Sequence, residues 1–253
     1  MFVISLFFIY YGKHMHLSVV IPAYNEEERI SKTLESINEY LSRQNFAYEI
    51  IVVNNNSQDK TAALVKEYEK RIHHIRLLDE PKPGKGYAVT KGILESQGKY
   101  RLFTDADNST TIDHIEKMMP YFDKGYDVVI GSLAVKGARI MQGGGEPWWR
   151  VLMGKAGNKF IQIFAVWGIN DTQRGFKIFT EQAVKDIFPR LTIFGWGFDV
   201  EVLALAKRFK YKIKEVPVTW NNDPNSKVNF WSYPQVLGQT LKVFWNLHTG
   251  KYS

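Results

Sequence analysis

Residues 100–107, Tyr-Arg-Leu-Phe-Thr-Asp-Ala-Asp, form a short apolar run that ends in two carboxylates one residue apart. A run of this kind is typical of a buried strand. Asp105 and Asp107 would lie at its carboxyl end, where they can share one divalent cation directly or through a water. Mg²⁺ and Mn²⁺ favour oxygen ligands and keep part of their coordination shell for substrate phosphates. The stretch therefore predicts a site at which a diphosphate departs with metal assistance.

An isolated Asp-x-Asp pair is more often a pair of solvated turn carboxylates, so the prediction depends on the surrounding sequence. On both sides, strand-like and helix-like segments alternate. The predicted strands are 17–21, 48–53, 75–78, 100–104 and 127–131, and the predicted helices are 25–41, 59–71, 87–96 and 112–122. Asn25 is expected to cap the first helix, with Glu28 in the reciprocal capping position.

Repeated strand–helix units predict an α/β fold with a doubly wound, mostly parallel sheet and helices on both faces. In such sheets ligands bind beyond the carboxyl ends of the strands. Residues 22–26, 54–59 and 105–107 all follow predicted strands. We therefore expect these polar segments to meet at one edge of the sheet.

After residue 131 the alternation loosens. Residues 137–145 are rich in glycine and predict a mobile loop. Further segments are expected to form an apolar helix, a strand, a helix, a strand and a final amphipathic helix: residues 148–167, 174–179, 198–209, 211–218 and 233–247. The last helix places Leu237, Leu241, Phe244 and Trp245 on one face. Such an aromatic stripe usually packs into a core, and docking on a membrane interface is the alternative.

The composition narrows the class of protein. The chain has 253 residues, 45% of them hydrophobic, which suits one large domain. It has no cysteine, so disulfides and thiolate metal sites are excluded. The formal net charge is +7, but the lysines are spread along the chain, which argues against nucleic acid as a partner. A membrane surface or a phosphate-rich substrate suits this charge better.

The first residues stand apart from this pattern. Residues 2–11 are strongly apolar, but a spanning helix needs roughly 20 apolar residues. The segment also lacks the features of a signal peptide, so Met15 is an alternative start. We expect a tail at 1–14, which need not be native, a main domain at 15–230 and the amphipathic helix at 231–253.

Several motifs carry a resemblance to a known family. Residues 17–27 (LSVVIPAYNEE), 54–61 (NNNSQDKT), 84–86 (GKG) and 105–107 (DAD) resemble, in order, motifs of the family 2 glycosyltransferases with the GT-A nucleotide-sugar fold. In the second half, residues 171–177 (DTQRGFK), 198–201 (FDVE), 215–220 (EVPVTW) and 226–228 (SKV) resemble the polyprenyl-phosphate hexose synthases, which include the dolichyl-phosphate glucosyl- and mannosyltransferases. The resemblance covers roughly residues 17–230.

This resemblance implies an inverting, metal-dependent hexosyltransferase. The donor would be UDP-glucose or, as second choice, GDP-mannose, and the acceptor a polyprenyl (dolichyl-type) phosphate at the cytosolic face of a membrane. A lipid phosphate has a second pKa of about 6 and arrives largely ionised, so no general base is strictly required. Two alternatives stay open. One is transfer to a sugar hydroxyl with Asp199 as base, and the other is a nucleotide-sugar binding protein that has lost catalysis.

The resemblance also implies roles for individual residues. Asp105 and Asp107 would hold Mg²⁺ or Mn²⁺, with Ala106 between them, and Lys85 would contact the diphosphate. The nucleoside pocket would be framed by Pro22, Ala23, Tyr24, Glu26, Asn54 and Asn55, although Tyr24 could instead be a core residue. The acceptor phosphate would meet Arg150, Arg174, Lys177 and Lys227. Asp199 would orient the acceptor or a sugar hydroxyl, and Glu201 is expected to have a structural role.

Three positions depart from the family pattern. Asn54 and Asn55 replace the usual aspartates, which leaves an acceptor oxygen and adds donors. Leu133 stands where Gly131-Ser132 is usually followed by an arginine. Arg174 stands where the glucosyltransferases usually have a small residue, and it is a candidate to compensate for the missing arginine.

Overall fold

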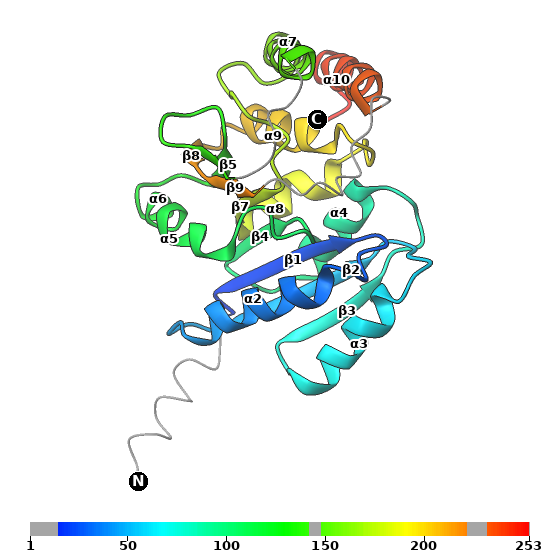
Figure 1. The fold of residues 1–253 in the computed structure, drawn as a ribbon. Helices are drawn as coiled ribbons and strands as arrows, with labels where there is room; N and C mark the ends of the chain where they lie inside the picture. The colour runs from blue at the N-terminus through cyan, green and yellow to red at the C-terminus, as the bar shows by residue number, and fades with distance from the viewer. Residues whose placement is uncertain (1–14, 142–147, 222–231, 253) are drawn as a thin grey trace.

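The computed structural model describes residues 15–141, 148–221 and 232–252, and Figure 1 shows their arrangement. A seven-stranded sheet has the order β3-β2-β1-β4-β7-β5-β8. The strands are β1 (Leu17–Ala23), β2 (Tyr48–Asn54), β3 (Ile75–Asp79), β4 (Tyr100–Thr104), β5 (Val128–Ser132), β7 (Phe176–Thr180) and β8 (Ile213–Pro217). β7 is antiparallel to β4 and β5, and the other pairings in this sheet are parallel. The prediction of a mostly parallel α/β sheet is confirmed.

Helices cover both faces of the sheet. In chain order they are α2 (Ile30–Ser42), α3 (Thr61–Arg71), α4 (Lys85–Glu95), α5 (Ile115–Met118), α6 (Pro120–Asp123), α7 (Trp148–Phe164), α8 (Glu181–Ile187), α9 (Phe198–Arg208) and α10 (Ser232–His248). Short 3₁₀ helices occur at Ile112–His114 and Phe188–Arg190. The expected helix at 112–122 is thus divided, and Pro120 starts its last part.

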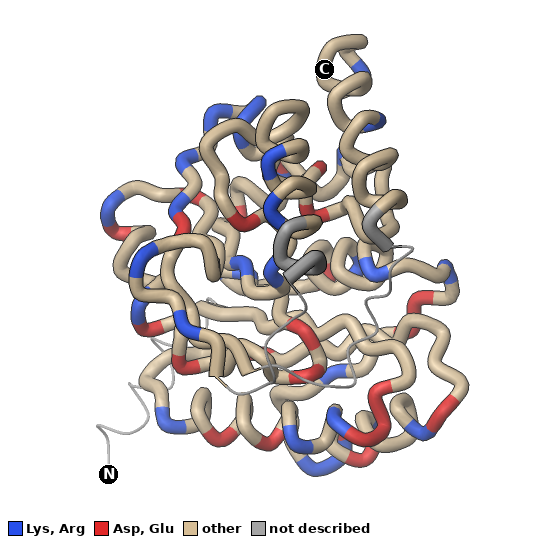
Figure 2. Tube along the Cα trace, turned by 45° about the horizontal axis from the view of Figure 1, so that its top comes forward, with Lys and Arg blue, Asp and Glu red and all other residues tan. Residues whose placement is uncertain are grey.

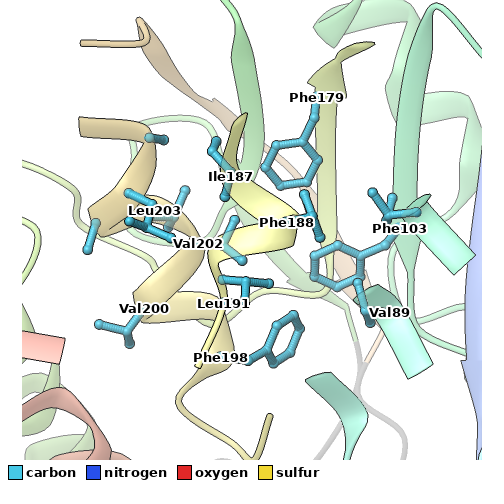
Figure 3. Packing of buried hydrophobic residues seen from close by; sticks show 14 of the residues in the cluster. Val89, Phe103, Phe179, Ile187, Phe188, Leu191, Phe198, Val200, Val202 and Leu203 are labelled. Atoms are coloured by element: carbon cyan, nitrogen blue, oxygen red, sulfur yellow. The ribbon is translucent and has the colours of Figure 1, made fainter. Parts of the chain in front are cut away.

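The two faces of the sheet form two hydrophobic cores because side chains alternate along each strand. Leu17, Val19 and Ile21 of β1 pack in one core with α2 and α3, whereas Val20 packs in the other with α4, α8 and α9. Figure 3 shows part of the second core, where Phe103 from β4 lies near Val89 of α4. This alternation fixes the register, and with it the position of every strand end.

The prediction that Asn25 caps the first helix is wrong. α2 begins at Ile30, and Asn25 adopts a left-handed conformation with φ of 51°. The Asn25 side chain accepts a hydrogen bond from the Gln58 backbone N–H at 2.8 Å, and its own N–H donates to Ser57 Oγ at 3.0 Å. The turn after β1 therefore binds the turn after β2 instead of capping a helix.

A second, two-stranded sheet pairs β6 (Arg139–Met141) with β9 (Thr219–Asn221) in parallel. β6 lies inside the expected glycine-rich loop, whose remainder extends beyond the described residues. α7 and α10 pack against each other, and α10 also contacts α9 (Figure 1). The expected tail at 1–14 is outside the described residues. Within the described part, no helix has the length and apolarity to cross a membrane.

Candidate functional site

The strand register brings the polar motifs to one edge of the sheet. β1, β2 and β4 are parallel and end at Ala23, Asn54 and Thr104. β7 runs the opposite way, so its first residue, Phe176, pairs with Thr104 at the same edge. The segment 171–175 therefore arrives beside Asp105.

The Asp105–Asp107 turn is held from three sides. Thr33 Oγ1 of α2 donates to the Ala106 carbonyl at 2.6 Å, and the Ser109 N–H donates to Asp107 Oδ1 at 2.9 Å. The Asp105 N–H donates to the Gly175 carbonyl at 3.2 Å. A Cβ atom at Gly175 would lie 2.1 Å from Asp105 Oδ2, so any other residue at 175 would push the Asp105 carboxylate out of this position. Both carboxylates are thus fixed before any ligand binds.

The electrostatics of this turn fit a divalent cation. Burial and the negative charge of Asp105 raise the pKa of Asp107 above its ordinary value. A bound cation would relieve this repulsion between the two carboxylates. The described residues contain no group of three or more His, Cys, Asp or Glu side chains that could hold a metal. The pair would therefore supply part of a coordination shell and leave the rest for phosphate oxygens and water.

Lys85 lies at the start of α4 and contacts this turn. Its Nζ is 2.6 Å from Asp105 Oδ1. Burial alone would lower the pKa of Lys85, but the neighbouring carboxylates, Asp105 foremost, raise it above its ordinary value. The Lys85 ammonium is therefore protonated and places a positive charge beside the carboxylate pair.

The flanking glycines explain how Lys85 is positioned. Gly84 has φ of 139°, and a Cβ at Gly86 would lie 2.6 Å from Phe194 Cα. The Gly86 N–H donates to the Phe194 carbonyl at 2.9 Å, and the Tyr87 and Phe194 rings stack with centroids 3.9 Å apart. The GKG motif, residues 84–86, therefore contacts Phe194 and so joins the first half of the chain to the second.

Lys177 and Asp199 form a buried ion pair beneath this edge. Lys177 Nζ lies 2.5 Å from Asp199 Oδ1 and also donates to the Arg174 carbonyl. Lys177 is fully buried and Asp199 is 4% exposed. Burial raises the pKa of Asp199 and lowers that of Lys177, and their mutual attraction opposes both shifts. The expected contact of Lys177 with an acceptor phosphate does not fit this geometry, because its ammonium is enclosed; Lys177 instead positions Asp199.

Arg174 is held by two neighbouring side chains next to the Asp105–Asp107 turn. Its Nε lies 3.3 Å from Asp171 Oδ2, and its guanidinium lies 4.8 Å from the Trp220 ring centroid. The same Asp171 oxygen accepts a hydrogen bond from the Leu133 N–H at 2.9 Å. Arg174 therefore lies beside the position where relatives are expected to have an arginine, as compensation for Leu133 requires.

The two asparagines that replace aspartates have clear structural partners. Asn54 Nδ2 donates to Asp79 Oδ1 at 2.8 Å. Asn55 Nδ2 donates to the carbonyls of Glu80 and Lys82, and its Oδ1 accepts from the Gly84 N–H at 2.9 Å. An aspartate at either position would lack these donors. The amides therefore organise the 79–84 segment that leads to Lys85, and contact with a base stays a prediction.

Asn55→Asp is expected to destabilise the protein by about 3 kcal/mol, because a buried carboxylate would face two carbonyl oxygens. The 79–84 segment, which these hydrogen bonds hold, would loosen as well. Urea unfolding measures the loss of stability, and hydrogen–deuterium exchange of residues 79–84 measures the loosening. Asn56→Asp is the matched control, because Asn56 is exposed in the same turn. Equal stability of the two variants would contradict the assigned role.

The remaining donor-side residues lie at the end of β1. Tyr24 is 50% exposed, so its interpretation as a core residue is wrong. Pro22 and Ala23 belong to β1 itself, where they pair with β2. Glu26 is buried and forms an ion pair of 2.5 Å with Arg29. These positions border the same edge, and nucleoside contact stays a prediction for each.

On the acceptor side, Arg150 lies in the first turn of α7, but its side chain is outside the described part of the chain. Lys227 also falls outside the described residues. Glu201 has the structural role expected. It accepts hydrogen bonds from the N–H groups of Thr192 and Ile193 and from the Tyr252 hydroxyl.

Sequence reasoning missed three residues that shape the site. Gly175 allows the approach to Asp105, Asp171 holds Arg174, and Phe194 packs on the GKG turn. Gly175 and Asp171 both lie inside the 171–177 motif, which was a usable signal. Phe194 has no local signal, since its contact depends on how the two halves of the chain meet.

Comparisons with known proteins identify the family of the chain. The sequence model of the family described as Glycosyl transferase family 2 matches residues 18–188. The chain belongs to this family and is a hexosyltransferase by class. It is 37% identical over 242 residues to a dolichyl-phosphate beta-glucosyltransferase of Trichomonas vaginalis. The alignment covers 90% of this chain and 73% of that protein. The human dolichyl-phosphate beta-glucosyltransferase is 34% identical to this chain, and the alignment covers 93% of this chain and 77% of the human protein.

The fold also has solved counterparts. Glucosyl-3-phosphoglycerate synthase of Mycobacterium tuberculosis, in complex with Mn²⁺, uridine-diphosphate-glucose and phosphoglyceric acid, superimposes with a TM-score of 0.67. The sequence identity is 18%, and the alignment covers 97% of this chain and 85% of that one. This similarity shows a GT-A fold for the chain.

Proposed function

We propose that the protein transfers glucose from UDP-glucose to the phosphate of a dolichyl-type polyprenyl phosphate, with inversion at the anomeric carbon. The names of its relatives support glucose as the sugar and dolichyl phosphate as the acceptor. The observation that carries it is the fixed carboxylate pair Asp105 and Asp107 with the Lys85 ammonium beside it.

In this proposal Asp105 and Asp107 would hold Mg²⁺ or Mn²⁺, which supplies positive charge to the departing diphosphate. Lys85 adds a second cation at the same place, and its raised pKa keeps it protonated at neutral pH. Neutralising the leaving group is the main electrostatic demand of the reaction. The diphosphate would thus leave toward the end of β4.

The acceptor phosphate would lie near Arg174, whose guanidinium has further donors for it. Asp171 and Trp220 hold this side chain in place, so little ordering is needed on binding. Asp199 is enclosed and paired with Lys177, which makes it a poor general base. This arrangement favours an acceptor that arrives ionised over a sugar hydroxyl, which would need a base.

The lipid acceptor would be met at a membrane surface, and we place the protein at the cytosolic face. Purified protein with Mn²⁺ should label a short polyprenyl phosphate from UDP-glucose faster than from GDP-mannose. The free polyprenol, which lacks the phosphate, is the matched control and should stay unlabelled. Labelling of the polyprenol or of a soluble glycan, but not of the phosphate, would overturn the proposed acceptor.

A further inference from the structure

α7 and α10 together expose large apolar side chains. The two helices meet through Phe164 and Phe244, whose ring centroids lie 5.6 Å apart. Four apolar residues of these helices and of the turn after α7 remain exposed by 46–67%, and we call them the α7–α10 face: Ile163, Trp167, Leu241 and Trp245. Core packing, the first interpretation of the last helix, is therefore wrong for Leu241 and Trp245. Several large exposed apolar side chains on two helices that pack together point to an interaction site.

The charge of this region has one sign. Residues 148–170 and 232–253 contain no Asp or Glu, but they contain five basic residues: Arg150, Lys155, Lys159, Lys242 and Lys251. Figure 2 shows where Lys and Arg lie along the chain. Lys159 Nζ also lies 5.3 Å from the Trp167 ring centroid. Exposed indoles beside lysines are the side chains that favour a membrane interface.

A basic cleft opens at the end of this face. Its volume is about 510 Å³, and it is lined by Ala165, Trp167, Ala204, Lys207, Arg208, Leu247 and His248. Lys207 Nζ donates to the Trp167 carbonyl, and Arg208 Nη1 donates to the Leu247 carbonyl at 3.2 Å. No ion pair joins either cation to a carboxylate among the described residues.

These cations also satisfy two carbonyls, one in the turn after α7 and one in the last turn of α10, which is a structural role. Each uses one donor for that purpose, whereas an ammonium has three and a guanidinium five. Both side chains line the cleft together with the apolar residues Ala165, Trp167, Ala204 and Leu247, and no carboxylate is among its lining residues. Phosphate is the anion that such a group of donors suits, and the adjacent Trp167 favours one attached to a lipid.

We propose that this cleft binds the phosphate of an anionic phospholipid while the α7–α10 face rests on the bilayer. The inference rests on the proposed function in one respect: the acceptor lipid would lie in the same membrane. The cleft is separate from the acceptor site, since Asp199 is in the first turn of α9 and Arg208 is its last residue. At 1.5 Å per residue, about 14 Å of helix separates them.

Vesicle flotation of the full chain tests the proposal. Lys207→Gln/Arg208→Gln removes two charges but keeps an N–H donor for each carbonyl. Lys66→Gln/Lys70→Gln is the matched control, because both lysines are exposed on α3, far from this face (Figure 1). With phosphatidylserine present, we expect partitioning to fall about ten-fold or more for the cleft variant. The control should change about two-fold at most, and both should match wild type on phosphatidylcholine alone.

Equal losses of vesicle binding in both variants would mean that net charge alone attracts the protein to the membrane. That result would overturn the phospholipid site. Equal partitioning of wild type onto phosphatidylserine and phosphatidylcholine vesicles, with inorganic phosphate still bound in solution, would overturn the lipid assignment in favour of a free anion. Unfolding midpoints check that both variants are folded. Glucose transfer to a short, water-soluble polyprenyl phosphate should be unchanged in the cleft variant. If wild type fails in that transfer assay but still floats as predicted, the proposed function fails while the lipid site stands.

Discussion

Asp107→Asn is expected to lower kcat/KM by about a thousand-fold while leaving the protein folded. A bound metal supplies several kcal/mol of transition-state stabilisation, and about 4 kcal/mol corresponds to that factor. Asparagine keeps an oxygen that can accept from the Ser109 N–H, so the turn should persist. Stability should be unchanged or slightly higher, because burial and repulsion from Asp105, which raise the pKa of Asp107, no longer act on a charged group.

Two measurements check this result. Steady-state transfer gives kcat/KM, and thermal unfolding with and without Mn²⁺ reports metal binding. Mn²⁺ should raise the unfolding midpoint of wild type but not of Asp107→Asn. Asp123→Asn is the control, because Asp123 is exposed on α6 and should behave as wild type. Undiminished turnover in Asp107→Asn would remove the metal assignment.

Lys177→Met is expected to cause the largest loss of stability of any single change at the site. It would leave Asp199 buried without its partner, which typically costs about 3–5 kcal/mol. For a chain of this size, the unfolding midpoint should fall by about 10 °C. Activity should fall too, because Asp199 and the Arg174 carbonyl lose the group that holds them.

A double variant separates the two effects. Lys177→Met/Asp199→Asn removes the unpaired charge, so most of the stability should return while transfer stays slow. Lys185→Met is the control, because the Lys185–Glu181 pair is exposed and should cost about 1 kcal/mol or less. If the double variant regained full activity, Asp199 would have no part in the site. If Lys177→Met were as stable as wild type, the Lys177–Asp199 ion pair would contribute nothing to the stability of the protein.

The sequence was sufficient to predict the sheet edge on which the site is built. The apolar run before Asp105 predicted the strand, and the alternation of strands and helices predicted a mostly parallel sheet. The GKG turn and the 171–177 motif also meet the Asp105–Asp107 turn at this edge. These features depend on local periodicity and on residues that are close in sequence, which is why they were predictable.

The roles of Lys177 and Asn25 were not predictable in this way. Lys177 is buried because β7 runs antiparallel between β4 and β5, where its side chain meets Phe103 and Asp199. Strand order of this kind depends on long-range pairing, which the local pattern does not contain. Asn25 fits a capping pattern, but its side chain finds a better partner in the turn after β2.

The central claim is a metal-dependent transfer of glucose to a lipid phosphate at the Asp105–Asp107 turn. The most direct measurement follows labelled glucose from UDP-glucose into the organic phase with a short polyprenyl phosphate, in Mn²⁺ and again after EDTA. We predict label in the lipid with Mn²⁺ and its loss with EDTA, restored by added Mn²⁺. Labelling that EDTA does not affect, or bound UDP-glucose with no label in the lipid, would contradict it.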